Sequence, residues 1–132
     1  MDNVETLYAK PLPSSRSGAF YNTFPYPTKI SPEAIAVYIA CTTNPGDTVL
    51  DAFAGSGSTG VAALLCEHPT NRMEEIAKSL NVTPIWGARN AVLYEIGTYP
   101  SFAIKTILSR ITNREFTEAV DVFLRKSARS RW

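Results

Sequence analysis

The glycine-rich run Asp51–Gly60 carries the clearest chemistry in the sequence. It reads Asp-Ala-Phe-Ala-Gly-Ser-Gly-Ser-Thr-Gly, so Gly55, Gly57 and Gly60 fit the pattern G-x-G-x-x-G. Glycine permits a tight turn and lets a ligand approach the bare backbone at a helix N-terminus. The run lies after a β-branched segment and before an apolar helical pattern, the context in which such loops hold nucleotide-type cofactors. NAD, FAD and S-adenosylmethionine (SAM) proteins all use such loops, so the glycines alone do not choose among them.

Three side chains around the loop favour SAM over a dinucleotide. Asp51 stands four residues before the first glycine, where a carboxylate repels a pyrophosphate but suits the cationic, amino-bearing methionine end of SAM. Phe53 gives the loop an apolar surface beside the cofactor. Glu95 closes the next predicted strand, where a carboxylate can accept hydrogen bonds from both ribose hydroxyls. The gap from Gly57 to Glu95 exceeds the ~20 residues usual for these units, and an extra predicted helix accounts for the difference.

The same run resembles the first SAM motif of amino-methylating DNA methyltransferases, the N6-adenine and N4-cytosine enzymes, which usually read Asp-Pro-Phe-x-Gly-Ser-Gly-Thr-Thr. Upstream, residues 24–33 read Phe-Pro-Tyr-Pro-Thr-Lys-Ile-Ser-Pro-Glu. They resemble the Pro-Thr-x-Lys-like turn and helix that hold the methionine end of the cofactor in that family. The resemblance covers residues 18–65 closely and residues 88–104 loosely. It implies a cofactor site, with Lys29 near the cofactor carboxylate, that consists of Thr28, Lys29, Asp51, Phe53, Ala54, Gly55, Ser56, Gly57, Ser58, Thr59, Glu95 and Ile96.

Two departures from the family pattern bear on the reaction. Ala52 stands where the family prefers proline, which should loosen the turn without removing a ligand. The family also holds its flipped target base with an (Asp/Asn/Ser)-Pro-Pro-(aromatic) loop, which accepts hydrogen bonds from the exocyclic amine and stacks on the base. The 132 residues contain no Pro-Pro pair. The sequence therefore assigns no catalytic residue, and it assigns no metal ligand.

Hydrophobic periodicity and turn chemistry predict the elements that position these residues. The predicted helices cover residues 31–41, 59–66, 70–80, 101–111 and 117–129. The last of them is expected to turn Val120, Phe123 and Leu124 inward. The predicted strands are a buried parallel strand over residues 48–51 and a second strand over residues 91–95.

The order of these elements predicts the α/β class. We expect a partial doubly wound (Rossmann-like) SAM-methyltransferase half-domain with an incomplete parallel sheet, because two strands make a poor independent sheet. Residues 1–30 are expected to form an extended arm, since Pro11, Pro13, Pro25 and Pro27 break helices. Residues 31–132 would then be the SAM-binding half of the domain.

Composition places the chain among globular proteins. The apolar fraction is 45%, the charged fraction 19% and the net charge +1. No apolar stretch is long enough to span a membrane, and the first residues lack the pattern of a secretory signal. Two cysteines among apolar neighbours, Cys41 and Cys66, are too few for a disulfide framework or a zinc site. These features favour a reducing, cytoplasmic setting.

The leading hypothesis is the SAM-binding portion of a DNA amino-methyltransferase. DNA would be the substrate, reached directly or through a partner chain. The missing strands and loop would come from a second methyltransferase subunit, or the chain would be a truncated product. A homo-oligomer would also cover the open sheet edge. Two alternatives stay open: a non-catalytic binding or assembly module that keeps the loop, and a methyltransferase for RNA or a small molecule, since fold does not fix the substrate.

Overall fold

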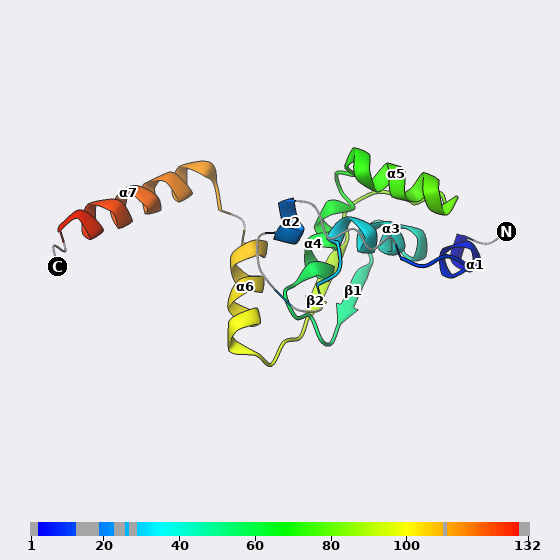
Figure 1. Cartoon of the computed structure of the whole chain (residues 1–132), viewed down its shortest axis with the longest axis horizontal. Coiled ribbons are helices and arrows are strands. Elements are labelled where there is room, and N and C mark those ends of the chain that lie inside the picture. Colours follow the sequence, from blue (N-terminus) through cyan, green and yellow to red (C-terminus); the bar gives the residue numbers. More distant parts are fainter. Residues whose placement is uncertain (1–2, 13–18, 23–25, 27–28, 110, 130–132) are drawn as a thin grey trace.

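The protein is described here by a computed structural model that covers residues 3–12, 19–22, 26, 29–109 and 111–129 (Figure 1). Helices and strands alternate along most of the chain. In order they are α1 (Asn3–Tyr8), α2 (Ala19–Asn22), α3 (Pro32–Thr42), β1 (Thr48–Asp51), α4 (Ser58–Leu65), α5 (Asn71–Leu80), β2 (Asn90–Leu93), α6 (Thr98–Leu108) and α7 (Asn113–Arg129). This arrangement is compatible with a partial α/β domain.

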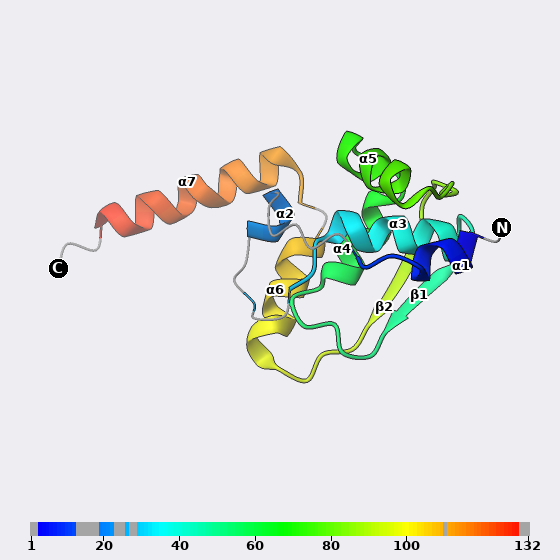
Figure 2. The same ribbon diagram turned by 45° about the vertical axis from the view of Figure 1, so that its right-hand side comes forward.

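The two strands form a parallel pair. Thr48 lies opposite Asn90 and Asp51 lies opposite Leu93, and Figure 2 shows both strands running in the same direction. Helices α4 and α5 make the crossover between them, as parallel pairing requires. The backbone pairing continues beyond β2, because the Tyr94 amide donates to the Asp51 carbonyl at 2.9 Å. The sheet therefore brings Asp51 and the segment after β2 together at the carboxyl end of the two strands.

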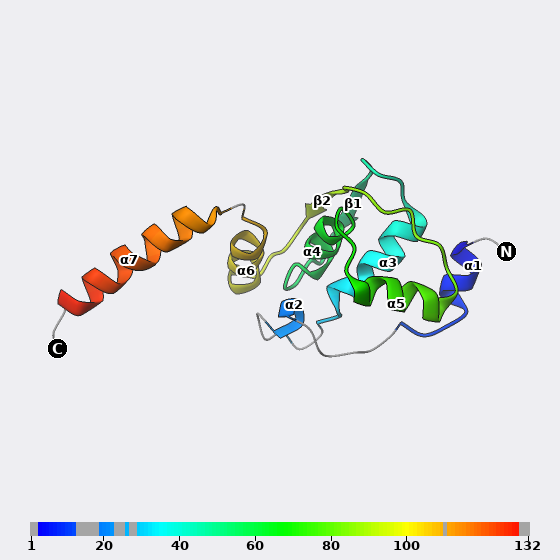
Figure 3. The ribbon, with the colours of Figure 1, turned by 90° about the horizontal axis from the view of Figure 1, so that it is seen from above.

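The core lies between the sheet and helix α5. Helices α3 and α4 occupy the middle, and α5 covers their outer side (Figure 3). Val37, Cys66 and Met73 are fully buried there. Burial of an apolar side chain of this size stabilises a fold by about 1.5–3 kcal/mol, so this layer of helices anchors the strand that leads into the glycine loop.

Arg89 holds the start of β2 in place. Its guanidinium is buried and donates to the carbonyl oxygens of Ile85 (2.7 Å), Gly87 (2.8 Å) and Thr43 (2.8 Å). It also donates to the Thr43 hydroxyl at 3.2 Å. Since Thr43 follows α3, this one side chain ties the end of α3 to the segment that precedes β2.

The prediction that residues 48–51 form a buried strand is right for the element and wrong for the burial. Leu50 is 65% exposed and Val92, its register partner, is 41% exposed. Side chains alternate between the two faces of a strand, and in the described part of the chain the helices cover only the other face. The second strand also ends at Leu93, two residues earlier than predicted.

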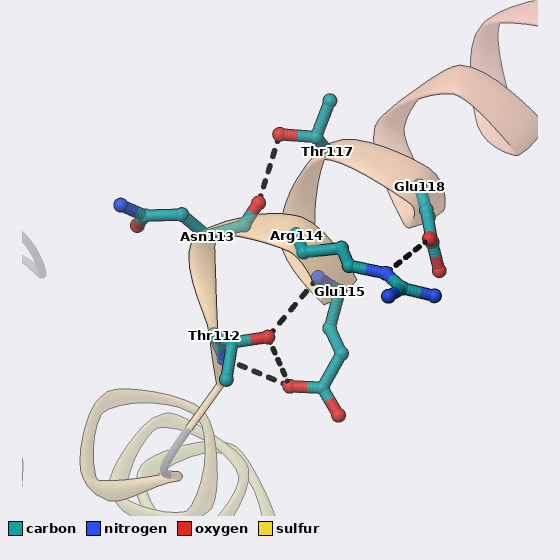
Figure 4. A network of polar contacts seen from close by, with 6 residues as sticks. All are labelled: Thr112, Asn113, Arg114, Glu115, Thr117 and Glu118. Carbon is teal, nitrogen blue, oxygen red and sulfur yellow. Dashed lines mark hydrogen bonds and ion pairs between the residues drawn. The ribbon is translucent and has the colours of Figure 1, made fainter.

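The inward placement of Val120, Phe123 and Leu124 is wrong as well. These side chains are 37%, 68% and 57% exposed, because α7 extends away from the body of the molecule (Figure 1). The start of α7 is held locally instead. The Glu115 carboxylate accepts from the amide and the hydroxyl of Thr112, and Arg114 pairs with Glu118 (Figure 4).

The expected extended arm contains helical segments. Helix α1 precedes the first proline, so nothing in residues 3–8 prevents a helical turn. Leu7 is fully buried, and the Tyr38 hydroxyl donates to the Leu7 carbonyl at 3.0 Å. Helix α6 likewise starts earlier than predicted, at Thr98, since Pro100 is tolerated within a first helical turn.

Two searches of the described residues complete the picture. None of their helices combines the length and the apolar character that a membrane span requires. No three His, Cys, Asp or Glu side chains among them gather closely enough to hold a metal ion.

Candidate cofactor site

The glycine loop turns sharply between β1 and α4. Gly55 and Gly57 both adopt left-handed backbone conformations, with φ of +52° and +81°. The Gly57 amide donates to the Ala54 carbonyl at 2.8 Å and closes the turn. Residues with a Cβ rarely adopt such angles, so these two glycines serve the shape of the loop itself.

Asp51 joins the two ends of this loop. One carboxylate oxygen accepts from the Phe53 amide at 3.0 Å, and the other accepts from the Thr59 hydroxyl at 2.6 Å. The carboxylate therefore sits at the mouth of the turn with its orientation fixed on both sides. Elsewhere in the loop, the Ser56 and Ser58 hydroxyl oxygens lie 3.3 Å apart and share a hydrogen bond.

Glu95 meets the loop from the other strand. Its Oε2 accepts from the Gly55 amide at 2.8 Å, and its Oε1 accepts from the Gly97 amide at 2.7 Å. The Ala54 amide donates to the Tyr94 carbonyl at 3.0 Å, next to this contact. Two segments 40 residues apart in sequence thus share one short hydrogen-bonded junction.

Two cavities open around the loop. The first has a volume of about 330 Å³. It is lined by Tyr26, Lys29, Ile30, Ile35, Asp51, Phe53, Ala54, Gly55, Ser56, Ser58 and Thr59. The second has a volume of about 520 Å³ and is lined by Tyr26, Ala52, Phe53, Tyr94, Glu95 and Ile96.

Tyr26 and Phe53 border both cavities. The Tyr26 ring lies over the loop, so close that a Cβ added to Gly55 would be 3.0 Å from Tyr26 Cε1. Phe53 is 91% exposed and stands between the two cavities. An elongated ligand that filled both cavities would pass between these rings.

Lys29 brings a positive charge to the first cavity. Its ammonium lies 5.7 Å from the centroid of the Tyr21 ring, within the range of a cation–π contact. Partial burial lowers the pKa of Lys29. With Asp51 in the same cavity, the lining offers one cationic and one anionic group.

The structure brings together most of the residues that the sequence predicts for the site. Lys29, Asp51 and the loop residues Ala54, Gly55, Ser56, Ser58 and Thr59 line the first cavity, and Glu95 and Ile96 line the second. Phe53 lines both cavities. Thr28 lies outside the described residues.

Gly57 lines neither cavity. A Cβ on Gly57 would lie 2.9 Å from Ile104 Cγ1, and one on Gly60 would lie 2.7 Å from Leu108 Cδ1 and from Leu93 Cδ1. These two glycines admit helix α6 against the loop and against α4. Glycine in such a motif can also let neighbouring elements pack closely. Close packing of α6 therefore accounts for a glycine at both positions.

Sequence reasoning missed several lining residues. Ile30 and Ile35 lie around the start of α3, Ala52 lies in the loop, and Tyr94 precedes Glu95. Their positions in the sequence could have indicated them, because each lies next to a predicted site residue or on the first turn of the helix that follows the Lys29 turn.

The glycine loop between β1 and α4 is held by Asp51 at the end of β1 and by Glu95 two residues after β2, and it belongs to a partial α/β domain. A family model described as DNA methylase, of the amino-methylating N6/N4 type, matches residues 3–96. That range covers well over half of the chain, so the chain belongs to the DNA methylase family. Neither the curated proteins nor the solved structures contain a match to it.

Proposed function

We propose that this chain is the SAM-binding portion of a DNA amino-methyltransferase that acts on N6 of adenine or N4 of cytosine. The observation that carries the proposal is the pair of cavities that meet at Tyr26 and Phe53. One cavity presents Lys29 and Asp51, and the other presents Glu95. Membership of the DNA methylase family makes SAM the expected methyl donor.

The chemistry of the two linings fits the two ends of SAM. In the first cavity, Asp51 would attract the amino group and Lys29 the carboxylate of the methionine portion. In the second cavity, Glu95 would accept from the ribose hydroxyls, and the apolar surfaces of Phe53 and Ile96 would contact the adenine ring. Thr28 stays a predicted contact at the methionine end.

When bound, SAM supplies an electrophilic methyl group on its sulfonium. The described residues contribute binding, orientation and exclusion of water, which suit an in-line displacement that needs positioning more than a strong base. The base-holding Pro-Pro-aromatic loop is absent from the 132 residues. We therefore propose that this loop and the remaining strands lie outside these 132 residues, in a second methyltransferase subunit or in a further part of the protein, and that DNA contacts the assembled enzyme.

Calorimetry with SAM or its stable product S-adenosylhomocysteine tests the proposal. We expect micromolar-range binding if the pocket is complete in this chain. Asp51→Asn keeps one acceptor oxygen for the loop but removes the charge, so we expect affinity to fall at least tenfold, equivalent to about 1.4 kcal/mol. Asp47→Asn is the matched control, because the Asp47 carboxylate accepts from the Asn44 amide in an exposed turn and lines neither cavity.

Two results would contradict the proposal. The first is no binding by the chain, alone or with its partner subunit, which favours a non-catalytic assembly module. The second is equal loss of affinity in both aspartate variants, which would mean that Asp51 does not face the ligand. A neighbouring reading frame should also encode a Pro-Pro-aromatic loop and three or four further strands.

A further inference from the structure

Glu95 lies two residues after the end of β2 and holds more than one segment of the structure in place. Both of its carboxylate oxygens already accept backbone hydrogen bonds, from Gly55 in the glycine loop and from Gly97 at the start of α6. The backbone carbonyl of the same residue accepts from the Ser101 hydroxyl at 3.2 Å. One residue therefore connects β2, the cofactor loop and the first turn of α6.

The backbone of Gly55 is constrained by its own conformation and by its neighbours. Its φ of +52° is a left-handed conformation, and the Tyr26 ring covers its outer face. The Glu95 carboxylate holds its amide from the other side. Loss of that hydrogen bond would remove one of the contacts that hold the Gly55 peptide in the wall of the first cavity.

The geometry also leaves room for a ligand on the same carboxylate. Each carboxylate oxygen has two lone-pair sites, and each oxygen of Glu95 uses one for a backbone amide. Two lone-pair sites therefore stay available for donors from the second cavity, which Glu95 lines. Backbone donors and a diol can share this group without displacing each other.

We infer that Glu95 is a positioning residue for the cofactor loop as well as a ligand. Its carboxylate fixes the Gly55 peptide and the start of α6 before the cofactor arrives, so a ribose diol meets an acceptor pair whose orientation is already set. This inference rests on the proposed function for the identity of the ligand. The fixing of the loop does not, since it is a property of the ligand-free chain.

The test is amide hydrogen exchange, followed by NMR on the full ligand-free chain. In Glu95→Gln only one side-chain oxygen can accept, and the NH₂ group faces the second amide. We expect the Gly55 or Gly97 amide to exchange at least fivefold faster than in the wild type, with α3 amides unchanged. Glu67→Gln is the matched control, because Glu67 is an exposed carboxylate near the end of α4.

A second measurement uses the wild type alone and decides the matter if the variant fails to fold. In the ligand-free chain, the amide nitrogens of Gly55 and Gly97 should each show a scalar coupling across the hydrogen bond to the side-chain carboxyl carbon of Glu95. A Glu95 side chain that faces solvent would show neither coupling. Absence of both couplings would overturn the inference.

The outcomes separate this inference from the proposed function. Unchanged exchange of Gly55 and Gly97 in Glu95→Gln overturns the positioning role, even if S-adenosylhomocysteine binding weakens in calorimetry. Faster exchange of either amide supports it. If the exchange result is as expected but wild-type chain binds no S-adenosylhomocysteine with or without its partner, the proposed function fails and the loop-fixing role stands.

Discussion

Replacement of Arg89 by methionine tests how the strand that leads to Glu95 is held in place. The guanidinium donates four hydrogen bonds at 2.7–3.2 Å, three of them to carbonyl oxygens. Methionine has a similar length and no donors, so the carbonyls of Thr43, Ile85 and Gly87 lose these partners. The link between the end of α3 and the start of β2 then depends on the remaining contacts, among them the bond from the Ile85 amide to the Ala40 carbonyl and the bond from the Asn90 side-chain amide to the Gly46 carbonyl.

The expected cost follows from these contacts. A hydrogen bond from a charged group contributes about 1.5–3 kcal/mol net. Two effects reduce the sum: water reaches some of the carbonyls, and removal of the charge relieves its desolvation. In the described part of the chain no carboxylate forms an ion pair with Arg89. We expect a net loss of about 3 kcal/mol, a large share of the roughly 5–15 kcal/mol that stabilises a domain.

Urea unfolding, followed by far-UV circular dichroism and tryptophan fluorescence, measures this loss. With a denaturant slope of about 1–3 kcal/mol/M, the midpoint should fall by at least ~1 M at an unchanged slope. Arg89→Lys should fall between wild type and Arg89→Met, because an ammonium keeps three donors without the planar fork. Arg114→Met is the control, since Arg114 is 86% exposed and pairs only at the surface. Equal midpoints for Arg89→Met and Arg114→Met would refute the reasoning.

Three further predictions concern other parts of the chain. Gly57→Ala should cost about 2–4 kcal/mol in the same urea assay, because its φ of +81° disfavours a Cβ and that atom would lie 2.9 Å from Ile104 Cγ1. Adding Ile104→Ala to the Gly57→Ala variant should recover the part of this loss that comes from packing, but not the part that comes from the backbone conformation. A Gly57→Ala variant as stable as the wild type would contradict the prediction. Burial raises the pKa of Cys41 to about 11. At pH 8 its alkylation by iodoacetamide should therefore be more than ~100-fold slower than in the chain unfolded by urea, where a thiol with a pKa of about 8.5 is about a quarter ionised. Equal alkylation rates at Cys41, located by mass spectrometry, would disprove this. Hydrogen bonds from Thr112 lower the pKa of Glu115. They therefore stabilise the start of α7 at pH values above the pKa of this carboxyl in the unfolded chain. The stabilisation is lost as the pH falls through the pKa of Glu115 in the folded chain. Amide exchange over residues 113–117 should show this pH dependence, and Glu115→Gln should remove it.

Local sequence patterns predicted the elements around the site well. The β-branched run at residues 48–51 and the capping threonine at Thr70 give β1 and α5 the predicted bounds to within one residue. The family-like motif also predicted which side chains gather around the loop, since most of them line one of the two cavities. In these segments the residues within one or two turns decide the conformation.

Features that depend on contacts between segments far apart in the chain could not be predicted from the sequence. The pattern of apolar residues in α7 predicts a buried face, but only packing against another element can bury it, and in the described residues α7 extends away from the body. The family resemblance likewise places Gly55 and Gly57 beside the cofactor, yet Gly57 lines neither cavity and instead admits Ile104 of α6 against the loop. The Glu95–Gly55 hydrogen bond joins residues 40 positions apart, and no periodicity could indicate it.

The exposed face of the sheet leads into the second cavity, so a partner that covers this face would also close the cofactor site. Leu50 and Val92 lie side by side on that face, and parallel sheets are normally covered on both faces. The exposed apolar side chains continue past the end of β2 to Tyr94 and Ile96, which line the second cavity and are 62% and 102% exposed. Under the proposed function, a subunit that covers Leu50 and Val92 therefore also closes the adenosine side of the cofactor site. Cofactor affinity should then rise when that subunit is added, because the same contact buries the sheet and removes water from around the ligand.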